Sequence, residues 1–310
     1  IAIIWTWFLT GTLDFTPGGI LSGKIEPTIL PFLLALYMFG IGKAALMPFH
    51  SWLPAAMVAP TPVSALLHAV AVVKAGVFTV LKVIVYIFGI DFLSATGAST
   101  WLIWVASFTL LVSSLIALSK DNLKARLAYS TVSQLSYIVL AAALATKLSI
   151  LGAGLHIATH ALGKITLFMC AGAIYVATRK TEISDMDGLG RLMPFTFIAF
   201  AIGAFSIIGL PPFAGVWSKW YMALGAANLE LFLVIAIYMV SSLLNVGYLL
   251  PVVARAFFKP LPQQLQPSGS KNLSEAPLLC VIPLCITALG CLVLFFFAGE
   301  VIDLLRPIVN

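Results

Sequence analysis

Three ionisable side chains, His156, His160 and Lys164, lie four residues apart in an otherwise apolar stretch of the chain. Each step of four residues in an α-helix turns by about 40°, so all three lie on one stripe that rises about 12 Å. Imidazole titrates near neutral pH, which suits the transfer of protons. A lone buried histidine is often only a hydrogen-bonded core residue, but packing alone would not select three ionisable groups on one apolar face. The stripe therefore predicts a proton relay.

Two more ionisable residues, His68 and Lys74, lie inside another long apolar stretch. A charged side chain deep in a membrane helix costs roughly 2.5–3.5 kcal/mol and by default marks a functional site. Lys74 lies near the middle of the stretch that begins around Pro62, too deep to extend its ammonium group to either end. In a regular helix His68 would point about 120° away from Lys74. Both are predicted relay residues.

Two further lysines adjoin helix-breaking residues. Lys43 precedes a proline-rich stretch, and Lys219 follows a Pro-Pro pair and a glycine. A broken helix leaves backbone carbonyls without intrahelical partners, and these can solvate a buried ammonium group. We therefore add Lys43 and Lys219 to the predicted relay. The predicted break residues are Pro48, Pro54, Pro60, Pro62, Pro211, Pro212 and Gly215.

The composition shows what kind of chain must position these residues. Of the 310 residues 61% are apolar and only 9% are charged, and the mean hydropathy is +1.09. A soluble domain is about 25% charged, so most of this surface must face lipid. The net charge of +6 therefore reports loop orientation and does not indicate nucleic-acid binding. The sequence predicts an all-α, polytopic membrane helix bundle, because a lipid-exposed backbone must satisfy its own hydrogen bonds.

Eight stretches are long enough to span a bilayer, after a short apolar segment at 1–9 that we interpret as the end of a helix whose beginning is missing. The predicted spans are 28–50, 63–90, 101–119, 127–146, 149–178, 192–218, 231–254 and 276–299. Alternation assigns the loops at 51–62, 119–126, 179–191 and 255–275 to one side. That side holds nine lysines and arginines, namely Lys120, Lys124, Arg126, Arg179, Lys180, Arg191, Arg255, Lys259 and Lys271.

The opposite side holds only Lys24, Lys147 and Arg306, with Lys82 as a fourth if it extends outward. The basic side is therefore predicted to be cytoplasmic. We expect a multi-pass protein of the cell's inner (cytoplasmic) membrane with its C-terminus on the outer side.

The chain shows no pattern that would bind a cofactor or a metal ion. Its four cysteines form no CxxC pair and no cluster with histidine. Every aspartate and glutamate lies in a predicted loop or near a span end. Either the buried lysines are often neutral, or their carboxylate partner lies in a missing N-terminal part or in a neighbouring subunit. We expect no catalytic chemistry within this chain.

Several motifs together resemble one family. The stretch from Gly42-Lys43 through Pro48-Phe49-His50-Ser51-Trp52-Leu53-Pro54, continued to His68, resembles the signature of the antiporter-like membrane subunits. Respiratory complex I (NADH:quinone oxidoreductase), membrane-bound hydrogenases and Mrp-type cation/proton antiporters share these subunits. The series His156, His160, Lys164 and the segment from Gly209-Leu210-Pro211-Pro212 to Lys219 resemble later family motifs in order and spacing.

The resemblance implies a subunit built from two inverted five-helix repeats, each with one discontinuous helix, of which this chain is an N-terminally truncated part. Residues 1–90 would end the first repeat, with its broken helix around 43–62. Residues 91–254 would form the second repeat, with its broken helix around 209–219. Residues 255–310 would be a cytoplasmic loop and a C-terminal helix. The lysine set is most similar to that of the D-type subunits of Mrp antiporters.

We therefore expect a proton-translocating subunit of a multisubunit monovalent cation/proton antiporter, with other membrane subunits as partners and protons and Na⁺ or K⁺ as the transported ions. The alternative is the corresponding proton-pumping subunit of complex I or a related hydrogenase. In that case the chain would serve an enzyme whose redox centres lie in partner subunits. A membrane scaffold without transport would limit polar residues to helix ends, which the positions of Lys74 and Lys164 argue against. A quinone-processing enzyme would need a catalytic acid or a redox centre, for which the sequence offers no candidate.

Overall fold

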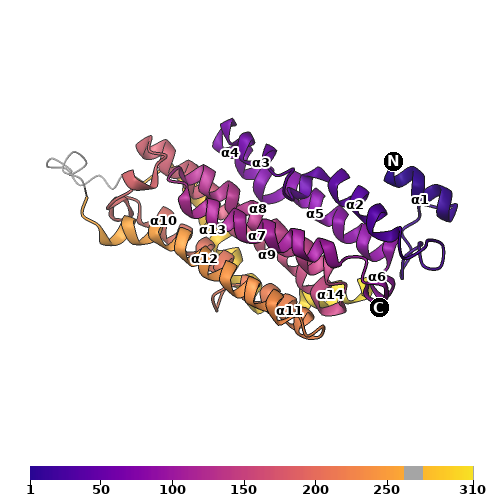
Figure 1. Ribbon diagram of the computed structural model, residues 1–310. Helices are drawn as coiled ribbons and strands as arrows, with labels where there is room; N and C mark the ends of the chain where they lie inside the picture. Colours follow the sequence, from indigo (N-terminus) through magenta and orange to yellow (C-terminus); the bar gives the residue numbers. More distant parts are fainter. Residues whose placement is uncertain (262–274, 310) are drawn as a thin grey trace.

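The computed structural model describes residues 1–261 and 275–309, and within these ranges the regular structure is helical (Figure 1). The predicted all-α membrane bundle is confirmed. Residues 262–274 and 310 lie outside the described residues. They include Lys271 and parts of the predicted 255–275 loop and 255–310 segment. The α-helices are α1 (Ala2–Thr10), α2 (Leu30–Gly40), α3 (Trp52–Ala55), α4 (Thr61–Ala65), α5 (Val72–Lys82), α6 (Ile90–Thr96), α7 (Thr100–Ser119), α8 (Leu123–Ala143), α9 (Lys147–Thr178), α10 (Pro194–Ile208), α11 (Gly215–Ala227), α12 (Phe232–Phe258), α13 (Leu278–Phe296) and α14 (Ala298–Leu305).

Five helical segments in the described ranges are long and apolar enough to cross a membrane: Thr61–Phe88, which includes α4 and α5, together with α7, α9, α12 and α13. Two shorter apolar helices, α2 and α10, begin the two spans for which breaks were predicted. The remaining predicted span is α8, which is long but carries many polar residues. The predicted end of the 28–50 span is wrong, because α2 stops at Gly40 and only a short 3₁₀-helix at Gly42–Ala44 follows it.

The long helix α8 forms the centre of the bundle. It packs against both α7 and α9, and Figure 1 shows these three helices between the indigo and purple helices α1 to α5 and the orange α11 and α12. Nearly every residue of α8 is buried, including Ser130, Ser133, Gln134 and Tyr137. A helix that is buried all round must satisfy its polar side chains within the protein. The polar residues of α8 therefore have to meet partners on neighbouring helices.

The predicted break prolines play different roles. Pro48 lies in the non-helical stretch after α2. Pro54 lies inside the short helix α3, and Pro60 directly precedes α4. Pro62 lies in the first turn of α4, where a missing backbone N–H costs nothing. Pro211 lies in the gap between α10 and α11. Only part of the first proline set therefore interrupts a helix.

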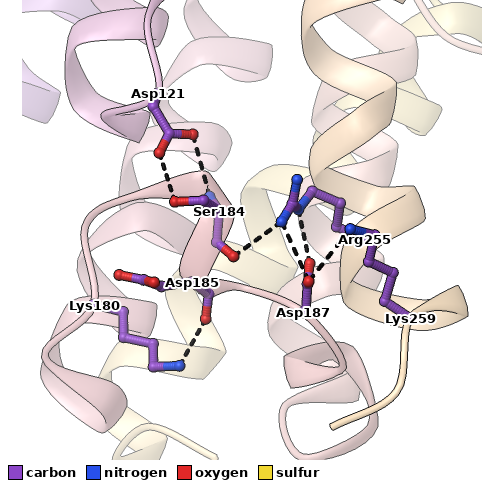
Figure 2. A network of polar contacts seen from close by, with 7 residues as sticks. All are labelled: Asp121, Lys180, Ser184, Asp185, Asp187, Arg255 and Lys259. Atoms are coloured by element: carbon purple, nitrogen blue, oxygen red, sulfur yellow. Dashed lines mark hydrogen bonds and ion pairs between the residues drawn. The ribbon is translucent and has the colours of Figure 1, made fainter. Parts of the chain in front are cut away.

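A polar network connects the loops to one another and to α12 at the end of the bundle where the lysines and arginines are concentrated, the basic end (Figure 2). The carboxylate of Asp187 accepts hydrogen bonds from Arg255 Nε at 2.7 Å and Nη2 at 3.2 Å, and Lys259 Nζ lies 3.4 Å away. Arg255 Nη2 also donates to the Ser184 carbonyl at 3.0 Å, while the Ser184 hydroxyl donates to Asp121 at 2.6 Å. The network joins the end of α12 to the loops on either side of α8 and α9.

Replacing Asp187 with asparagine is expected to lower the free energy of unfolding by only about 1 kcal/mol, because the ion pair is partly exposed. The loss should shrink at high salt, which screens exposed charges. Thermal unfolding of the purified protein at low and high ionic strength measures both effects. Asp303→Asn is the control. The side chains of its ion pair, Arg306 and Asp303, are 65% and 67% exposed, so this pair should contribute almost nothing to the free energy of unfolding. Equal losses of unfolding free energy in the two variants would contradict the conclusion that Asp187 stabilises the contact between α12 and the loops.

Candidate functional site

Lys74 on α5 contacts His160 on α9 in the middle of the bundle. Lys74 is 7% exposed and His160 1% exposed, and Lys74 Nζ forms a hydrogen bond with His160 Nδ1. An ammonium group can donate to a neutral imidazole nitrogen, and the same proton can move to the ring, leaving a neutral amine. One proton can therefore lie on either Lys74 Nζ or His160 Nδ1.

His68 lies on the same side as Lys74, facing α9. Its ring is fully buried and packs 5.2 Å from the ring of Phe168 on α9. The expected divergence of about 120° between His68 and Lys74 does not apply, since both side chains contact α9. It assumed an uninterrupted α-helix, whereas a π-helical segment at Leu66–Val70 and a distorted residue, Ala71, separate the two. Such π-helical segments are frequent at functional sites.

His156 connects three helices. Its Nε2 lies 3.1 Å from Gln134 Oε1 on α8, and its Nδ1 lies 2.8 Å from the Ser218 hydroxyl on α11. A carbonyl oxygen only accepts, so Nε2 carries a hydrogen, while the hydroxyl can donate to a neutral Nδ1 or accept from a protonated one. When Nδ1 is protonated, the single hydrogen of the Ser218 hydroxyl can instead go to the Gly215 carbonyl, 3.0 Å away. The site can thus accommodate both protonation states of His156, whose ring lies 5.8 Å from that of His160.

Lys219 lies at the second helix break, as predicted. Its ammonium group donates to the Ile208 carbonyl at 2.9 Å, at the end of α10, and to the Ser242 hydroxyl at 3.0 Å. It also lies 4.8 Å above the ring of Tyr137, which in turn stacks on the ring of His156 at 5.8 Å. The carbonyl left free at the end of a broken helix therefore solvates this lysine.

Two glycines make the second break possible. Gly209 has a φ of +89°, a left-handed conformation that residues with a Cβ adopt only under strain. A Cβ on Gly215 would lie 1.8 Å from the Ser206 carbonyl oxygen. The start of α11 can therefore approach the end of α10 only because residue 215 is glycine.

Lys164 is fully buried and has different neighbours from the two histidines on its helix. Its ammonium group donates to Ser130 Oγ at 2.6 Å and to the Leu127 carbonyl at 3.2 Å, both on α8. The Tyr248 hydroxyl on α12 donates to the same Ser130 oxygen at 2.8 Å. Lys164 thus continues the stripe of α9 toward α8 and α12.

Lys43 is the predicted relay residue that the structure does not join to the others. Its side chain is exposed. Its backbone packs against Gly76 on α5, where a Cβ would lie 2.6 Å from the Lys43 carbonyl carbon. The expectation that freed carbonyls solvate a buried ammonium group holds for Lys219 and not for Lys43.

Most of the polar partners were not predicted from the sequence. Gln134, Tyr137 and Ser130 lie on α8, in a span that was treated as uncharged and apolar, and Ser218 and Ser242 lie on α11 and α12. One signal was present, because Ser130, Gln134 and Tyr137 recur every three or four residues and so share a helix face. Uncharged polar residues are common in membrane helices, so that spacing alone did not distinguish a site from ordinary packing.

Comparison with known proteins identifies the family. The family model described as "NADH:quinone oxidoreductase/Mrp antiporter, TM" matches residues 1–245. The chain belongs to this family. The predicted resemblance is thereby confirmed, and the matched range contains all seven predicted relay residues.

Individual members of the NADH:quinone oxidoreductase/Mrp antiporter family are similar over much of the chain. NADH-quinone oxidoreductase subunit N from Desulforudis audaxviator is 32% identical over 98% of this chain and 62% of its own length. NAD(P)H-quinone oxidoreductase chain 5 from Synechocystis sp. is 37% identical over 71% of this chain and 33% of its own length. The chain thus spans at most about three fifths of the length of these relatives.

Solved structures share the fold of this family member. A chain of the Mrp complex from Dietzia sp. is 22% identical and superposes with a TM-score of 0.85, covering 99% of this chain and 64% of that one. A chain of the membrane-bound sulfane sulfur reductase, an archaeal respiratory membrane complex, is 26% identical with a TM-score of 0.83 over 99% of this chain and 62% of that one. At sequence identities this low, the superpositions are evidence for the fold of the bundle alone.

Proposed function

We propose that the chain is part of a proton-translocating subunit of a multisubunit monovalent cation/proton antiporter. The observation that carries the proposal is the series of buried contacts from Lys74 to His160, on to His156, and through Tyr137 to Lys219. Lys164 extends it along α9, and His68 lies beside it. Lys43 would join the path through residues outside this chain.

The polar environment supports proton transfer along this series. Several buried polar atoms, among them His160 Nε2, Gln134 Nε2 and Asn245 Nδ2, have no hydrogen-bond partner within the described residues. Buried polar groups of this kind are normally satisfied by ordered water. Water at these atoms would bridge the 5.8 Å between the rings of His156 and His160. Like charges in a poorly screened interior repel, so a proton on one lysine would favour release from the next.

Replacing Lys74 with alanine in the full-length protein tests this function. Cation-dependent proton flux in vesicles is expected to fall about tenfold or more, because His160 loses the group that exchanges a proton with it. Lys82→Ala is the matched control: Lys82 lies on the same helix, and its ammonium group lies 3.8 Å above the ring of Phe15, away from the series. Undiminished flux in the Lys74 variant would refute the proposed path.

The second candidate is the proton-pumping subunit of a quinone oxidoreductase, and the names of the curated relatives favour it. The proton path would be the same, with redox chemistry in partner subunits as the energy source. Other membrane subunits are the proposed partners in either case. Affinity purification of the native complex distinguishes the two: small membrane subunits alone would favour the antiporter, and peripheral redox subunits the oxidoreductase.

The orientation and the repeat organisation also belong to the proposal. The excess of basic residues supports a cytoplasmic position for the loops beside Asp187 and Arg255, with the C-terminus on the outer side of the cell's inner membrane. The two interrupted helices, α2 with α3 and α10 with α11, would be corresponding elements of two inverted repeats, within 1–90 and 91–254. Labelling of single cysteines introduced near residue 259 and near residue 306 from each side of sealed vesicles tests the orientation.

A further inference from the structure

A cavity of about 980 Å³ lies at the basic end of the bundle, apart from the relay series. Its walls come from the start of the α4 span, from the second half of α9 and from the start of α13. The walls are apolar and include Leu66, Phe168, Met169 and Leu279. The volume is that of a pocket able to enclose a sizeable organic ligand.

The rim of the cavity opens toward the surroundings of the bundle. Val58 and Leu279, which line it, are 95% and 87% exposed. On a membrane protein an apolar surface of this kind faces lipid tails. The cavity is therefore continuous with the hydrocarbon region, and an acyl chain can enter it sideways.

The charged residues that line the polar end of the cavity are lysines, although the Glu182 carboxylate lies behind the lining and accepts from Asn122 at 2.9 Å. Lys124 and Lys180 line it, together with the uncharged Asn122 and Thr181, and none of the described lining residues is acidic. Lys124 Nζ donates to the Ala59 carbonyl at 2.8 Å, and Lys180 Nζ donates to the Asp185 carbonyl at 2.7 Å (Figure 2). An ammonium group has three donors, so each lysine is held in place and two of its donors have no partner among the described residues.

We propose that this cavity binds an anionic phospholipid, with its phosphate between Lys124 and Lys180 and an acyl chain along the apolar wall of α9 and α13. Basic pockets between membrane helices at the cytoplasmic face are a recognised setting for anionic headgroups, and a zwitterionic headgroup gains less from two ammonium groups. The lipid would fill the space between the α4 span and α13 and so support the helices that border the relay. The site is independent of which ion the protein transports.

Native mass spectrometry of the purified, full-length complex in detergent tests the proposal. Phosphatidylglycerol and phosphatidylcholine with identical acyl chains are the probes. We expect phosphatidylglycerol to bind about 25-fold more tightly, since each of the two lysines near the lipid phosphate contributes about fivefold. The double variant Lys124→Gln/Lys180→Gln should reduce this preference to near unity. Lys120→Gln is the matched control at the same end of the bundle, because Lys120 faces Tyr129 and does not line the cavity.

A second variant tests the apolar wall. Cys280→Trp, which adds bulk at a half-buried lining position, should weaken binding of both lipids while thermal unfolding shows a folded protein. Phosphatidylglycerol with a photoactivatable acyl chain should label peptides of α9 and α13. Equal binding of the two lipids, an unchanged preference in the double variant, or full competition by inorganic phosphate would each overturn the proposal. So would crosslinking of residue 280 to another protein helix, which would mean that a protein segment fills the cavity.

Discussion

Replacing Lys164 with methionine is expected to reduce proton flux about tenfold or more while leaving the protein at least as stable. Methionine has a similar length but cannot carry a proton. Burying an ammonium group is costly, and an apolar side chain of similar volume often stabilises such a site. Vesicle flux and thermal unfolding of the same purified protein measure the two effects separately.

The neighbours of Lys164 explain why its loss should leave no unsatisfied group. The Leu127 carbonyl still accepts from the Thr131 hydroxyl at 2.9 Å. Ser130 Oγ still accepts from the Tyr248 hydroxyl. The matched control is Lys120→Met, a lysine near the end of the bundle. Normal flux in the Lys164 variant would show that this lysine is structural, and a large loss of stability would contradict the hydrogen-bond argument.

The second large effect is expected from Gly215→Ala. The new Cβ would lie 1.8 Å from the Ser206 carbonyl oxygen, a backbone atom that no rotamer change can move. Overpacking of this kind costs about 1–3 kcal/mol, and here we expect the upper end of that range or more. Because α11 carries Ser218 and Lys219, its displacement should also reduce flux. Thermal unfolding and vesicle flux provide the measurements.

Gly247→Ala on α12 is the control for this prediction. Its Cβ would lie 3.4 Å from Leu118 Cδ1, an ordinary contact. Alanine is favoured over glycine inside a helix by up to about 1 kcal/mol, so this variant should be as stable as the parent or more stable. If Gly215→Ala proved equally harmless, the close approach of α10 and α11 would not be needed for the fold.

The relay on α9 shows what local sequence can predict. The positions of His156, His160 and Lys164 within one helix follow from a fixed turn per residue, and all three are buried as expected. The apolar composition likewise predicts the membrane class, since hydropathy sums over neighbouring residues. The second break was predictable for the same local reason, because Pro211, Pro212 and the glycines around them disfavour a continuous helix.

The first break was less predictable. Of its prolines, Pro62 begins a helix, since a proline in the first turn replaces an N–H that has no partner. Whether a proline ends a helix or starts one depends on which side of it the chain packs. The same holds for the π-helical segment at Leu66–Val70, which has no distinctive residue pattern and contains His68.

The sequence by itself therefore determined the membrane class, the helical architecture and the residue types that can carry protons, because these depend on hydropathy and on spacing within one helix. Only the tertiary structure decided which groups exchange hydrogen bonds. Lys74 meets His160 across 86 positions of the chain, and His156 meets Ser218 across 62. Such pairs arise from packing of helices that are distant along the chain, and a change of one residue in helical phase would separate them.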